Sequence, residues 1–354
     1  MIDFEIKNSI VLNLNKKMIL IDALHINNSG GKILLDYLIK SIEKSNIEVF
    51  YLLDDRITAE HLNIDKNNVL YLRANFINRF LFYIKNKNNF KKVLCFANIP
   101  PPIKLNAKIY TYLHQKLFLV IPKELTLKFK SILLIKSKIA KYLSSNSDYW
   151  IVQTKLMKVD LLNAYNINTA EKIKIHPFYP RLVSNTKEVI FRKKNTFLYV
   201  STYSPHKNFE NLLAGFKLFY DKNKIGELHL TLENNSGAIL VEIDELITKG
   251  YPIINHGFVD REKLFTIYKS SEFIVYPSLS ESFGLGIIEG IENGCNVIGA
   301  NLPYTKAVCI PSLLFNPYSV DSIADVLEMA VLREIKKTKQ LAFNEINNLL
   351  NLLN

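Results

Sequence analysis

The fold is decided by residues 277–297, which read PSLSESFGLGIIEGIENGCNV. The apolar residues 273–276 precede this stretch and predict a buried strand. Polar residues and two glycines follow, and isoleucines then recur at helical spacing from position 287. Where a strand runs through a loop into a helix, the first backbone N–H groups of the helix have no partners within it and can bind an anion. The stretch therefore predicts an anion site at the beginning of a helix.

Two carboxylates frame this predicted anion site. Glu281 lies in the loop, and Glu289 lies eight positions later in the helix. This spacing allows both to point into one crevice, with the N–H groups of residues 283–285 toward a diphosphate and Glu289 toward the hydroxyls of a ribose. Alternatively, Glu281 caps the helix and Glu289 lies on a solvated face. The two carboxylates alone do not decide between these interpretations.

Length and composition restrict the class of protein. The chain has 354 residues, of which 48% are hydrophobic and 22% are charged, as expected for a globular protein of two domains. No apolar run reaches the roughly 18 residues of a membrane span. Because Asp3 and Glu5 stand where a signal peptide would be apolar, we expect a cytoplasmic protein. The cysteines lack the spacing of a metal site, so no metal is expected.

Residues 126–142, TLKFKSILLIKSKIAKY, carry five lysines among apolar residues and contain no acid. This pattern predicts a basic amphipathic helix. Such a helix either packs on a core with a solvated outer face or lies on anionic lipid at the inner face of the cytoplasmic membrane. The net charge of +12 fits anionic lipid or an anionic substrate as a partner. No nucleic-acid-binding motif is present, so we expect no nucleic acid as a partner.

The N-terminal half alternates predicted strands with helices, which is typical of a doubly wound, Rossmann-like α/β sheet. A first buried strand is predicted at residues 16–24, and a polar loop with Gly30 and Gly31 leads to an amphipathic helix that begins at Lys32. The glycines would let the backbone approach a phosphate or a sugar, although a plain strand-to-helix turn also explains them. Later strands are predicted at residues 48–53, 69–72, 93–97, 109–114, 149–154 and 173–178.

His114 ends one of these predicted strands, and Gln115, which could assist it by hydrogen bonding, follows directly. A lone histidine is more often a structural group than a functional one. The carboxyl end of a strand in a doubly wound sheet is, however, where such folds bind their ligands. His114 is therefore a candidate functional residue.

The C-terminal half begins a second sheet. Residues 181–194 lose the periodicity and are charged, so we expect the linker between the domains there, and residues 196–200 predict the next buried strand. A polar loop from Ser201 to Lys207 leads to a helix that opens at Asn208. Lys207 adds a positive charge beside the free N–H groups of this helix, and the combination can hold a diphosphate. A lysine before a helix is otherwise ordinary and solvated.

Residues 277–289 resemble the donor-site motif of glycosyltransferase family 4, which comprises retaining enzymes of the GT-B fold and includes those of bacterial surface-polysaccharide and lipopolysaccharide clusters. In this motif Pro-Ser precedes Glu-x7-Glu, which encloses Phe-Gly-Leu. The resemblance is best over residues 197–308 and is weaker over residues 16–177. The matching residues are Pro277, Ser278, Glu281, Phe283, Gly284, Leu285 and Glu289.

The resemblance implies two facing Rossmann-like domains. Residues 1–180 would bind the acceptor and residues 195–335 the donor, and a C-terminal helix within residues 336–354 would pack back on the first domain. The implied activity is retaining transfer of a hexosyl group from a nucleotide-sugar to a glycan or lipid-linked acceptor in O-antigen, capsule or lipopolysaccharide synthesis. The nucleotide-sugar would be a substrate, and neither a cofactor nor a metal is implied.

The same resemblance gives the carboxylates and the lysine their roles. Lys207 and the helix that begins near Gly284 would hold the diphosphate and stabilise the leaving group as charge develops. Glu289 would bind the ribose. Glu281 would bind the sugar hydroxyls or support the developing positive charge.

Other residues would complete the site. His114 would orient or polarise the acceptor hydroxyl. The loop of residues 255–259, in which Phe258 lies, would contact the nucleotide base. The further donor-binding candidates are Gly30, Gly31, Ser201, Phe283 and Leu285.

Two alternative functions stay open. A nucleotide-sugar 2-epimerase has the same fold, but it would need further catalytic acids that the sequence does not identify. A non-catalytic, nucleotide-binding partner protein is kept open by two departures from the family. Ser201-Thr202 stands in place of Gly-Arg, and Ala307-Val308 stands in place of Glu-Val.

Overall fold

The computed structural model describes residues 12, 17–57, 64–123, 125–165, 167, 169–183 and 189–354. The chain divides into two compact units. The N-terminal unit comprises residues up to 121, 126–180 and 344–354, and the C-terminal unit comprises residues 122–125 and 181–343. Three residues used above, Asp3, Glu5 and Lys16, and residues 184–188 of the predicted linker lie outside the described residues.

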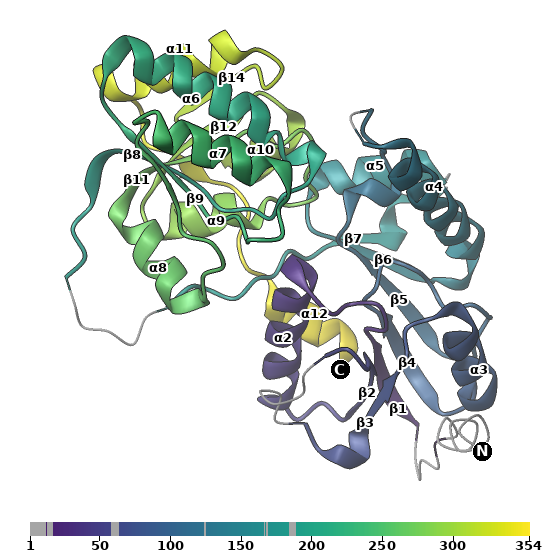
Figure 1. Cartoon of the computed structure of the whole chain (residues 1–354). Coiled ribbons are helices and arrows are strands. Elements are labelled where there is room, and N and C mark those ends of the chain that lie inside the picture. The colour runs from purple at the N-terminus through teal and green to yellow at the C-terminus, as the bar shows by residue number, and fades with distance from the viewer. Residues whose placement is uncertain are drawn as a thin grey trace. The chain divides into compact units, whose positions relative to one another are not determined.

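A seven-stranded sheet in the order β3-β2-β1-β4-β5-β6-β7 forms the centre of the N-terminal unit (Figure 1). All neighbouring strands in it are parallel, which confirms the predicted doubly wound sheet. The strand order changes direction between β1 and β4, and such folds bind ligands at the carboxyl ends of the strands there. The strands are β1 (Met18–Asp22), β2 (Val49–Asp54), β3 (Val69–Leu72), β4 (Phe90–Cys95), β5 (Lys108–Leu113), β6 (Tyr149–Val152) and β7 (Ile173–Ile175).

Helices connect these strands. The first of them begins at Ser29 rather than at Lys32, so Gly30 and Gly31 lie in its first turn and not in the preceding loop. Its buried side chains are leucines and isoleucines at helical spacing, as the amphipathic pattern predicted. The helices of this part of the chain are α2 (Ser29–Glu43), α3 (Phe76–Asn86), α4 (Leu127–Tyr142) and α5 (Lys155–Tyr165).

The last helix of the chain, α12 (Ile346–Leu353), belongs to the N-terminal unit. It lies beside α2 (Figure 1) and buries Leu349 and Leu353. The backbone N–H of Glu345 donates to the carbonyl of Pro177 at 2.7 Å, and Lys92 Nζ donates to the carbonyl of Leu352 at 3.1 Å. The C-terminus therefore returns to the N-terminal unit. The helix lies within the predicted residues 336–354.

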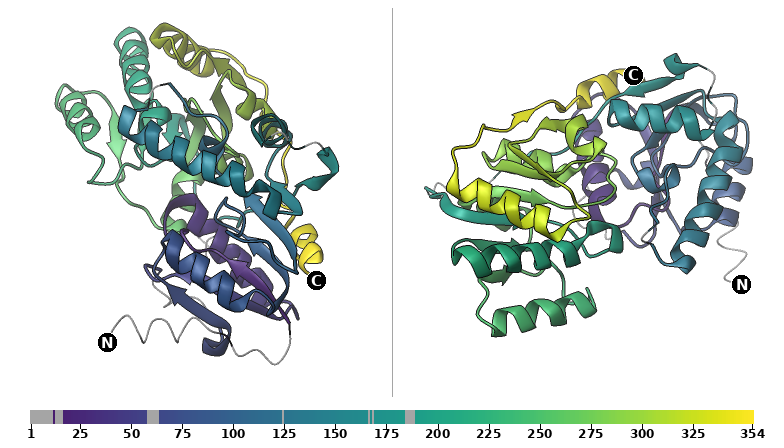
Figure 2. Two further views of the ribbon diagram at one scale, coloured as in Figure 1. Left: turned by 90° about the vertical axis from the view of Figure 1, so that its right-hand side faces the viewer. Right: turned by 90° about the horizontal axis from the view of Figure 1, so that it is seen from above.

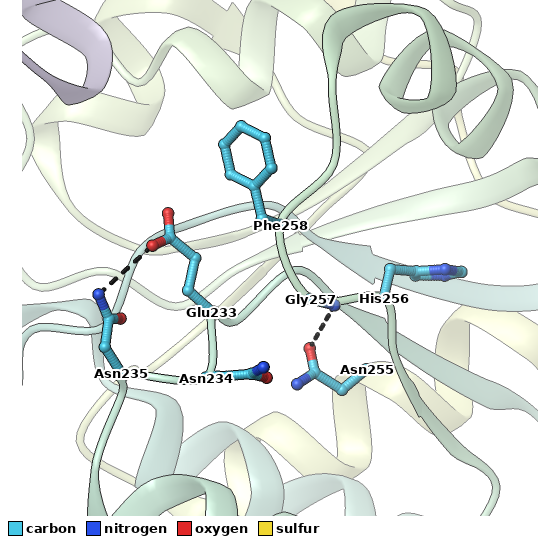
Figure 3. A pocket seen from close by; sticks show the side chains of 7 residues that line it. All are labelled: Glu233, Asn234, Asn235, Asn255, His256, Gly257 and Phe258. Carbon is cyan, nitrogen blue, oxygen red and sulfur yellow. Dashed lines mark hydrogen bonds between the residues drawn. The ribbon is translucent and has the colours of Figure 1, made fainter.

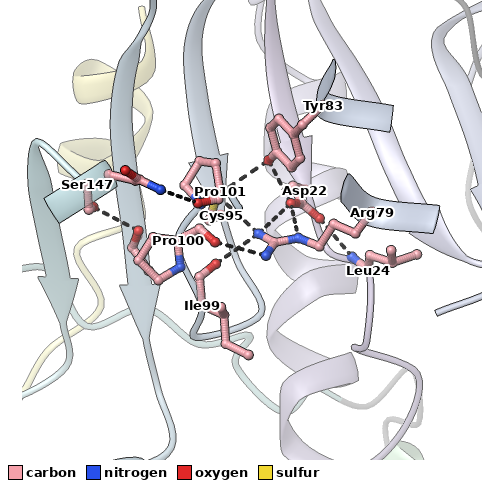
Figure 4. A network of polar contacts seen from close by, with 11 residues as sticks. Asp22, Leu24, Arg79, Tyr83, Cys95, Ile99, Pro100, Pro101 and Ser147 are labelled. Atoms are coloured by element: carbon pink, nitrogen blue, oxygen red, sulfur yellow. Dashed lines mark hydrogen bonds and ion pairs between the residues drawn. The ribbon is translucent and has the colours of Figure 1, made fainter. Parts of the chain in front are cut away.

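A buried polar network closes the carboxyl end of β1 (Figure 4). Arg79 Nε donates to Asp22 Oδ2 at 2.8 Å, and the hydroxyl of Tyr83 donates to the same oxygen at 2.7 Å. The other guanidinium nitrogens of Arg79 donate to the carbonyls of Ile99 and Pro100, at 2.9 Å each. Because three consecutive prolines cannot join a helix or a central strand, these bonds fix a segment that has no regular structure of its own.

The C-terminal unit contains a six-stranded sheet in the order β10-β9-β8-β11-β12-β14, with all neighbouring strands parallel. Its strand order changes direction between β8 and β11, which are direct neighbours. The predicted second Rossmann-like sheet is thereby confirmed. The strands are β8 (Lys193–Tyr199), β9 (Glu227–Leu230), β10 (Ile253–Asn255), β11 (Ser271–Tyr276), β12 (Asn296–Ala300) and β14 (Leu313–Phe315), and a separate antiparallel pair is formed by β13 (Cys309–Ile310) and β15 (Lys339–Gln340).

The helices of the C-terminal unit follow the strands in alternation, and α11 packs on α6 (Figure 2). The helix predicted to open at Asn208 begins one residue later, after a 3-10 turn, η6 (Pro205–Lys207). The helices are α6 (Phe209–Asn223), α7 (Ala238–Thr248), α8 (Arg261–Ser270), α9 (Leu285–Glu292), α10 (Pro303–Val308) and α11 (Val320–Leu332).

Candidate functional site

Two loops meet at the carboxyl ends of β8 and β11. One contains the turn η6, and the other is formed by residues 277–284. The backbone N–H of Leu279 donates to the carbonyl of His206 at 2.8 Å, and Ser278 Oγ donates to the same carbonyl at 3.2 Å. The hydroxyl of Tyr199 donates to the carbonyl of Lys207 at 3.0 Å and holds the turn on the sheet. Two segments that are distant in the sequence therefore form one surface at the point where ligands of such folds bind.

Lys207 and Glu281 form an ion pair across these two loops. Lys207 Nζ lies 2.6 Å from Glu281 Oε1, and the two side chains are only 16% and 12% exposed. The hydroxyl of Tyr276 donates to the same carboxylate oxygen at 3.3 Å. An ammonium group held in such a partly dry place attracts an anion more strongly than one in open water. The structure thus brings together the cation and the loop carboxylate that the sequence predicted for one site.

Gly284 precedes the first residue of α9 and has the left-handed backbone, with φ of 70°. A Cβ added here would lie 3.1 Å from Ile287 Cδ1, so both conformation and space favour glycine. The N-cap residue Gly284 makes no side-chain cap bond, and the carboxylate of Glu281, the alternative cap, instead contacts Lys207 and Tyr276. The first backbone N–H groups of α9 therefore follow directly on the loop that contains Glu281 of the Lys207–Glu281 pair.

Glu289 lies in α9 and is 5% exposed, which excludes the solvated face. Its Oε1 is 3.1 Å from Arg261 Nη1 at the beginning of α8, and its Oε2 accepts a bond from the hydroxyl of Tyr268 at 3.4 Å. Burial raises the pKa of Glu289 from 4.5 to about 7, against the opposing effect of the Arg261 charge. Sequence reasoning missed Arg261, because only the fold brings α8 next to α9.

Three further candidate donor-binding residues of this unit differ in which of their groups are accessible to a ligand. Ser201 is half-buried, and its hydroxyl donates to the neighbouring carbonyl of Thr202 at 3.2 Å. The Phe283 side chain is 3% exposed and packs in the core. A contact with the sugar donor at this position could therefore be made only by the backbone of Phe283. Leu285 is half-buried as the first residue of α9.

A pocket of about 590 Å³ lies between the loops that follow β9 and β10 (Figure 3). Asn255 joins these loops, because its Oδ1 accepts the backbone N–H of Leu232 at 2.9 Å and its Nδ2 donates to the carbonyl of Leu232 at 3.0 Å. The ring of Phe258 is 77% exposed at the edge of the pocket. The sequence predicted a role for the loop of Phe258, but it did not predict that the loop after β9, residues 233–235, forms the opposite side of the pocket. The lining residues are Glu233, Asn234, Asn235, Asn255, His256, Gly257 and Phe258.

His114 follows β5 in the N-terminal unit, and protein contacts hold its ring. Asn98 Nδ2 lies 3.1 Å from His114 Nε2, and Asn98 Oδ1 accepts the backbone N–H of His114 at 2.8 Å and that of Gln115 at 3.1 Å. The rings of Phe96 and Tyr112 have centroids 5.4 Å and 5.9 Å from that of His114. Burial lowers the pKa of His114 to about 4, so the imidazole is neutral at physiological pH.

Asn98, which Ile99 separates from the three prolines, was not among the candidate site residues predicted from the sequence. Its φ of 67° is rare for a residue other than glycine and is best tolerated by asparagine. Gly31 lies beside the same histidine, since a Cβ added to Gly31 would be 3.2 Å from His114 Cε1, whereas Gly30 has nothing within 4 Å of such an atom. The structure therefore groups Gly31, Asn98 and His114 at one edge of the N-terminal sheet.

The basic helix α4 exposes much of its apolar surface. Of its side chains only Leu133 and Ala140 are buried. None of the helices in the described part of the chain has the length and apolar character needed to cross a bilayer. The described residues also contain no cluster of three or more histidine, cysteine or acidic side chains suited to a metal ion. The exposed apolar residues of α4 are Leu127, Phe129, Ile132, Leu134, Ile135, Ile139 and Tyr142.

Residues 183–346 match the family model for glycosyl transferases group 1. Among curated proteins, the O-antigen chain mannosyltransferase B of Escherichia coli is 29% identical over 160 residues. That match covers 41% of this chain and 42% of the relative, so it spans less than half of either protein.

Solved structures extend the likeness to the whole fold. A lipopolysaccharide outer core galactosyltransferase, WaaB, has a TM-score of 0.60 at 17% identity over 89% of this chain and 90% of its own. The pneumococcal O-GlcNAc transferase GtfA, solved with UDP and GlcNAc, has a TM-score of 0.63 at 12% identity over 90% of this chain and 92% of its own. The fold of the chain is therefore that of the GT-B glycosyltransferases, and residues 183–346 resemble a glycosyl transferase group 1 domain.

Proposed function

We propose that the protein transfers a hexosyl group from a nucleotide-diphosphate sugar to a glycan or lipid-linked acceptor, with retention of the anomeric configuration. The acceptor would belong to a bacterial surface polysaccharide such as an O-antigen, a capsule or lipopolysaccharide. The observation that carries the proposal is the Lys207–Glu281 ion pair beside the uncapped beginning of α9. This arrangement supplies a cation and free N–H groups at one place, which is what a diphosphate requires.

The diphosphate is the leaving group of the proposed reaction, and its negative charge grows as the bond to the sugar breaks. Lys207 and the N–H groups at the beginning of α9 would stabilise that charge without a metal ion. A cation and amide groups that are already in place need little rearrangement during the reaction. We therefore expect transfer to continue when divalent metals are removed with a chelator.

Glu281 and Glu289 would contact the sugar and the ribose. Glu281 is close enough to Lys207 to lie beside the carbon from which the diphosphate departs, where positive charge develops. Glu289 would accept bonds from ribose hydroxyls in its ionised form, which the Arg261 charge favours against the effect of burial. The ribose would thus approach a carboxylate whose position Arg261 and Tyr268 already determine.

The acceptor side of the proposal rests on the N-terminal unit. His114 is neutral and hydrogen-bonded, so it would orient an acceptor hydroxyl rather than carry charge. The lysines and exposed apolar side chains of α4 suit the surface of a membrane that contains anionic lipid. A lipid-linked acceptor would be reached from there. The similarity to an O-antigen chain mannosyltransferase makes mannose the first sugar to test.

Replacing Lys207 with alanine tests the proposal. Loss of this cation should lower the rate of transfer to a lipid-linked acceptor by about 100- to 1,000-fold, the usual effect of deleting one group that stabilises transition-state charge. Lys222→Ala is the matched control, because Lys222 lies on α6, is 66% exposed and pairs with Glu328 away from the site. Equal turnover by the Lys207→Ala variant and the wild type would refute the role of Lys207.

The same assay separates the alternatives. A 2-epimerase would convert the donor sugar to its epimer without any acceptor, and proton NMR of the nucleotide-sugar would detect this. A non-catalytic partner would bind a nucleoside diphosphate without turnover on any acceptor. The anomeric configuration of the product, read by the same NMR method, would establish or reject retention.

A further inference from the structure

The pocket between the β9 and β10 loops is lined by a carboxylate, that of Glu233, and by an exposed aromatic ring, that of Phe258. From them we infer that the pocket selects guanine, so that the donor is a guanosine diphosphate sugar. The inference rests on the proposed function, because it names the base of the proposed donor. Its two elements are the carboxylate of Glu233 and the exposed ring of Phe258, which extend in the same direction from neighbouring loops (Figure 3).

The carboxylate of Glu233 is available to a ligand. Its one contact within the described part of the chain is Asn235 Nδ2, 3.5 Å from Oε2, which is long for a hydrogen bond. None of the described lysine or arginine side chains pairs with it. Glu233 is half-buried in the loop after β9, so a base placed there would exclude part of the water around the carboxylate.

Two of the other polar side chains of the pocket, those of Asn255 and His256, are bonded to the protein itself, and Asn234 and Asn235 carry uncharged amides. The amide of Asn255 is bonded on both atoms to Leu232. The ring of His256 turns to His229, with its Nε2 2.9 Å from His229 Nδ1. Glu233 is therefore the charged group that remains to read the edge of a base.

Phe258 supplies the second element. Its ring is 77% exposed, and no described aromatic side chain stacks on it. An aromatic face of this kind stacks on any nucleobase without regard to its identity. Phe258 would therefore hold the base, and the choice among bases would fall to Glu233.

An ionised carboxylate only accepts hydrogen bonds, and its two oxygens can accept two parallel bonds. Guanine presents two adjacent donors on one edge, the ring N1–H and the exocyclic amino group. Uracil presents a single N–H between two carbonyls, which a carboxylate repels. Adenine and cytosine place a ring acceptor beside the amino group. Guanine is thus the base whose edge matches Glu233.

A site built for a charged, paired hydrogen bond discriminates strongly against a base that lacks the donors. We expect the wild-type protein to bind GDP about 10- to 100-fold more tightly than UDP. Glutamine at position 233 keeps one acceptor oxygen and replaces the other with an NH₂ donor. This donor would face the amino group of guanine, which is also a donor, whereas it can bond to a carbonyl of uracil. Glu233→Gln should therefore weaken GDP binding by about 10-fold or more and leave UDP binding equal or stronger.

The experiment is a calorimetric titration of the full chain with GDP and UDP. Wild type, Glu233→Gln and the matched control Glu245→Gln would be compared, since Glu245 lies on α7, is 63% exposed and faces solvent beside Lys249. Circular dichroism of each variant checks its fold. The inference is supported if GDP is preferred and only Glu233→Gln removes the preference.

Two results would overturn the inference. The first is a wild-type preference for UDP, which needs no variant and leaves the proposed transferase activity intact. The second is an unchanged preference for GDP in a folded Glu233→Gln variant. If neither nucleotide binds and no nucleotide-sugar is turned over, the proposed function itself fails, and this outcome differs from both.

Discussion

Replacing Arg261 with methionine removes the positive charge that faces the buried carboxylate of Glu289. Arg261 Nη1 lies 3.1 Å from Glu289 Oε1, and the Glu289 side chain is 6% exposed, so water cannot take over the role of the guanidinium. Methionine keeps much of the length of the arginine stem. The variant therefore isolates the charge, and the expected effect is a loss of stability that depends on pH.

The magnitude follows from the pKa of Glu289. It is raised from 4.5 to about 7. As the pH rises, Glu289 therefore releases its proton at a lower pH in the unfolded chain than in the folded protein. The free energy of unfolding of the wild type consequently falls between pH 4.5 and about pH 7. Above pH 7 the native carboxyl ionises beside Arg261, and the loss stops. Without Arg261 the pKa of Glu289 rises further. The free energy of unfolding of the variant therefore continues to fall above pH 7, by about 1.4 kcal/mol per pH unit. Between pH 6 and pH 8 the destabilisation should grow by about 1–1.5 kcal/mol.

Urea unfolding followed by circular dichroism at pH 6 and pH 8 measures this difference. Arg333→Met is the control for loss of an exposed arginine of the same unit. A double variant, Arg261→Met with Glu289→Gln, removes the titrating carboxyl and should lose the pH dependence. If Arg261→Met destabilises the protein equally at the two pH values, the Arg261 charge does not hold Glu289 in its ionised form, and the reasoning is wrong.

Two further predictions concern the helix beginning and the basic helix. Gly284→Ala should destabilise the protein by about 1–2 kcal/mol, because Gly284 has a φ of 70° and alanine is strained there; an unchanged melting temperature would contradict this. The wild type should co-sediment with vesicles that contain anionic lipid and not with neutral vesicles, and Leu134→Ser with Ile135→Ser should abolish binding, since these α4 side chains are 50% and 59% exposed. Binding that survives the double change would place the contact elsewhere.

The parts of the site that lie within one strand–loop–helix unit were predictable from the sequence. Glu281, Gly284 and Glu289 follow β11 within a short stretch, and their relation is fixed by a single loop and the periodicity of one helix. The sequence placed Lys207 and Glu281 in one site, because parallel strands that end at one edge of a sheet bring their loops together, but it did not predict their ion pair. The boundaries were less certain, as Gly30 shows by lying inside α2.

The residues that the sequence did not predict contact partners on other helices, strands or loops. Arg261 reaches Glu289 from another helix, and Asn255 joins two loops through its amide. Asn98 positions His114 from the end of the neighbouring strand. An arginine or asparagine on a polar surface looks the same in the sequence whether it contacts water or a buried partner. Only the strand order reveals the partner, and that order depends on the packing of the whole sheet.

The Lys207–Glu281 pair has a further consequence under the proposed function. At a distance of 2.6 Å and little exposure, the two charges neutralise each other before the donor arrives and keep both side chains in place. As the diphosphate departs, its growing negative charge competes with Glu281 for Lys207. The carboxylate that loses part of this attraction then faces the sugar at the moment when positive charge develops there. A single ion pair would in this way supply a charge of each sign to the transition state. The Lys207→Ala variant would consequently lose more than a phosphate contact, because it also leaves Glu281 without the cation that positions it.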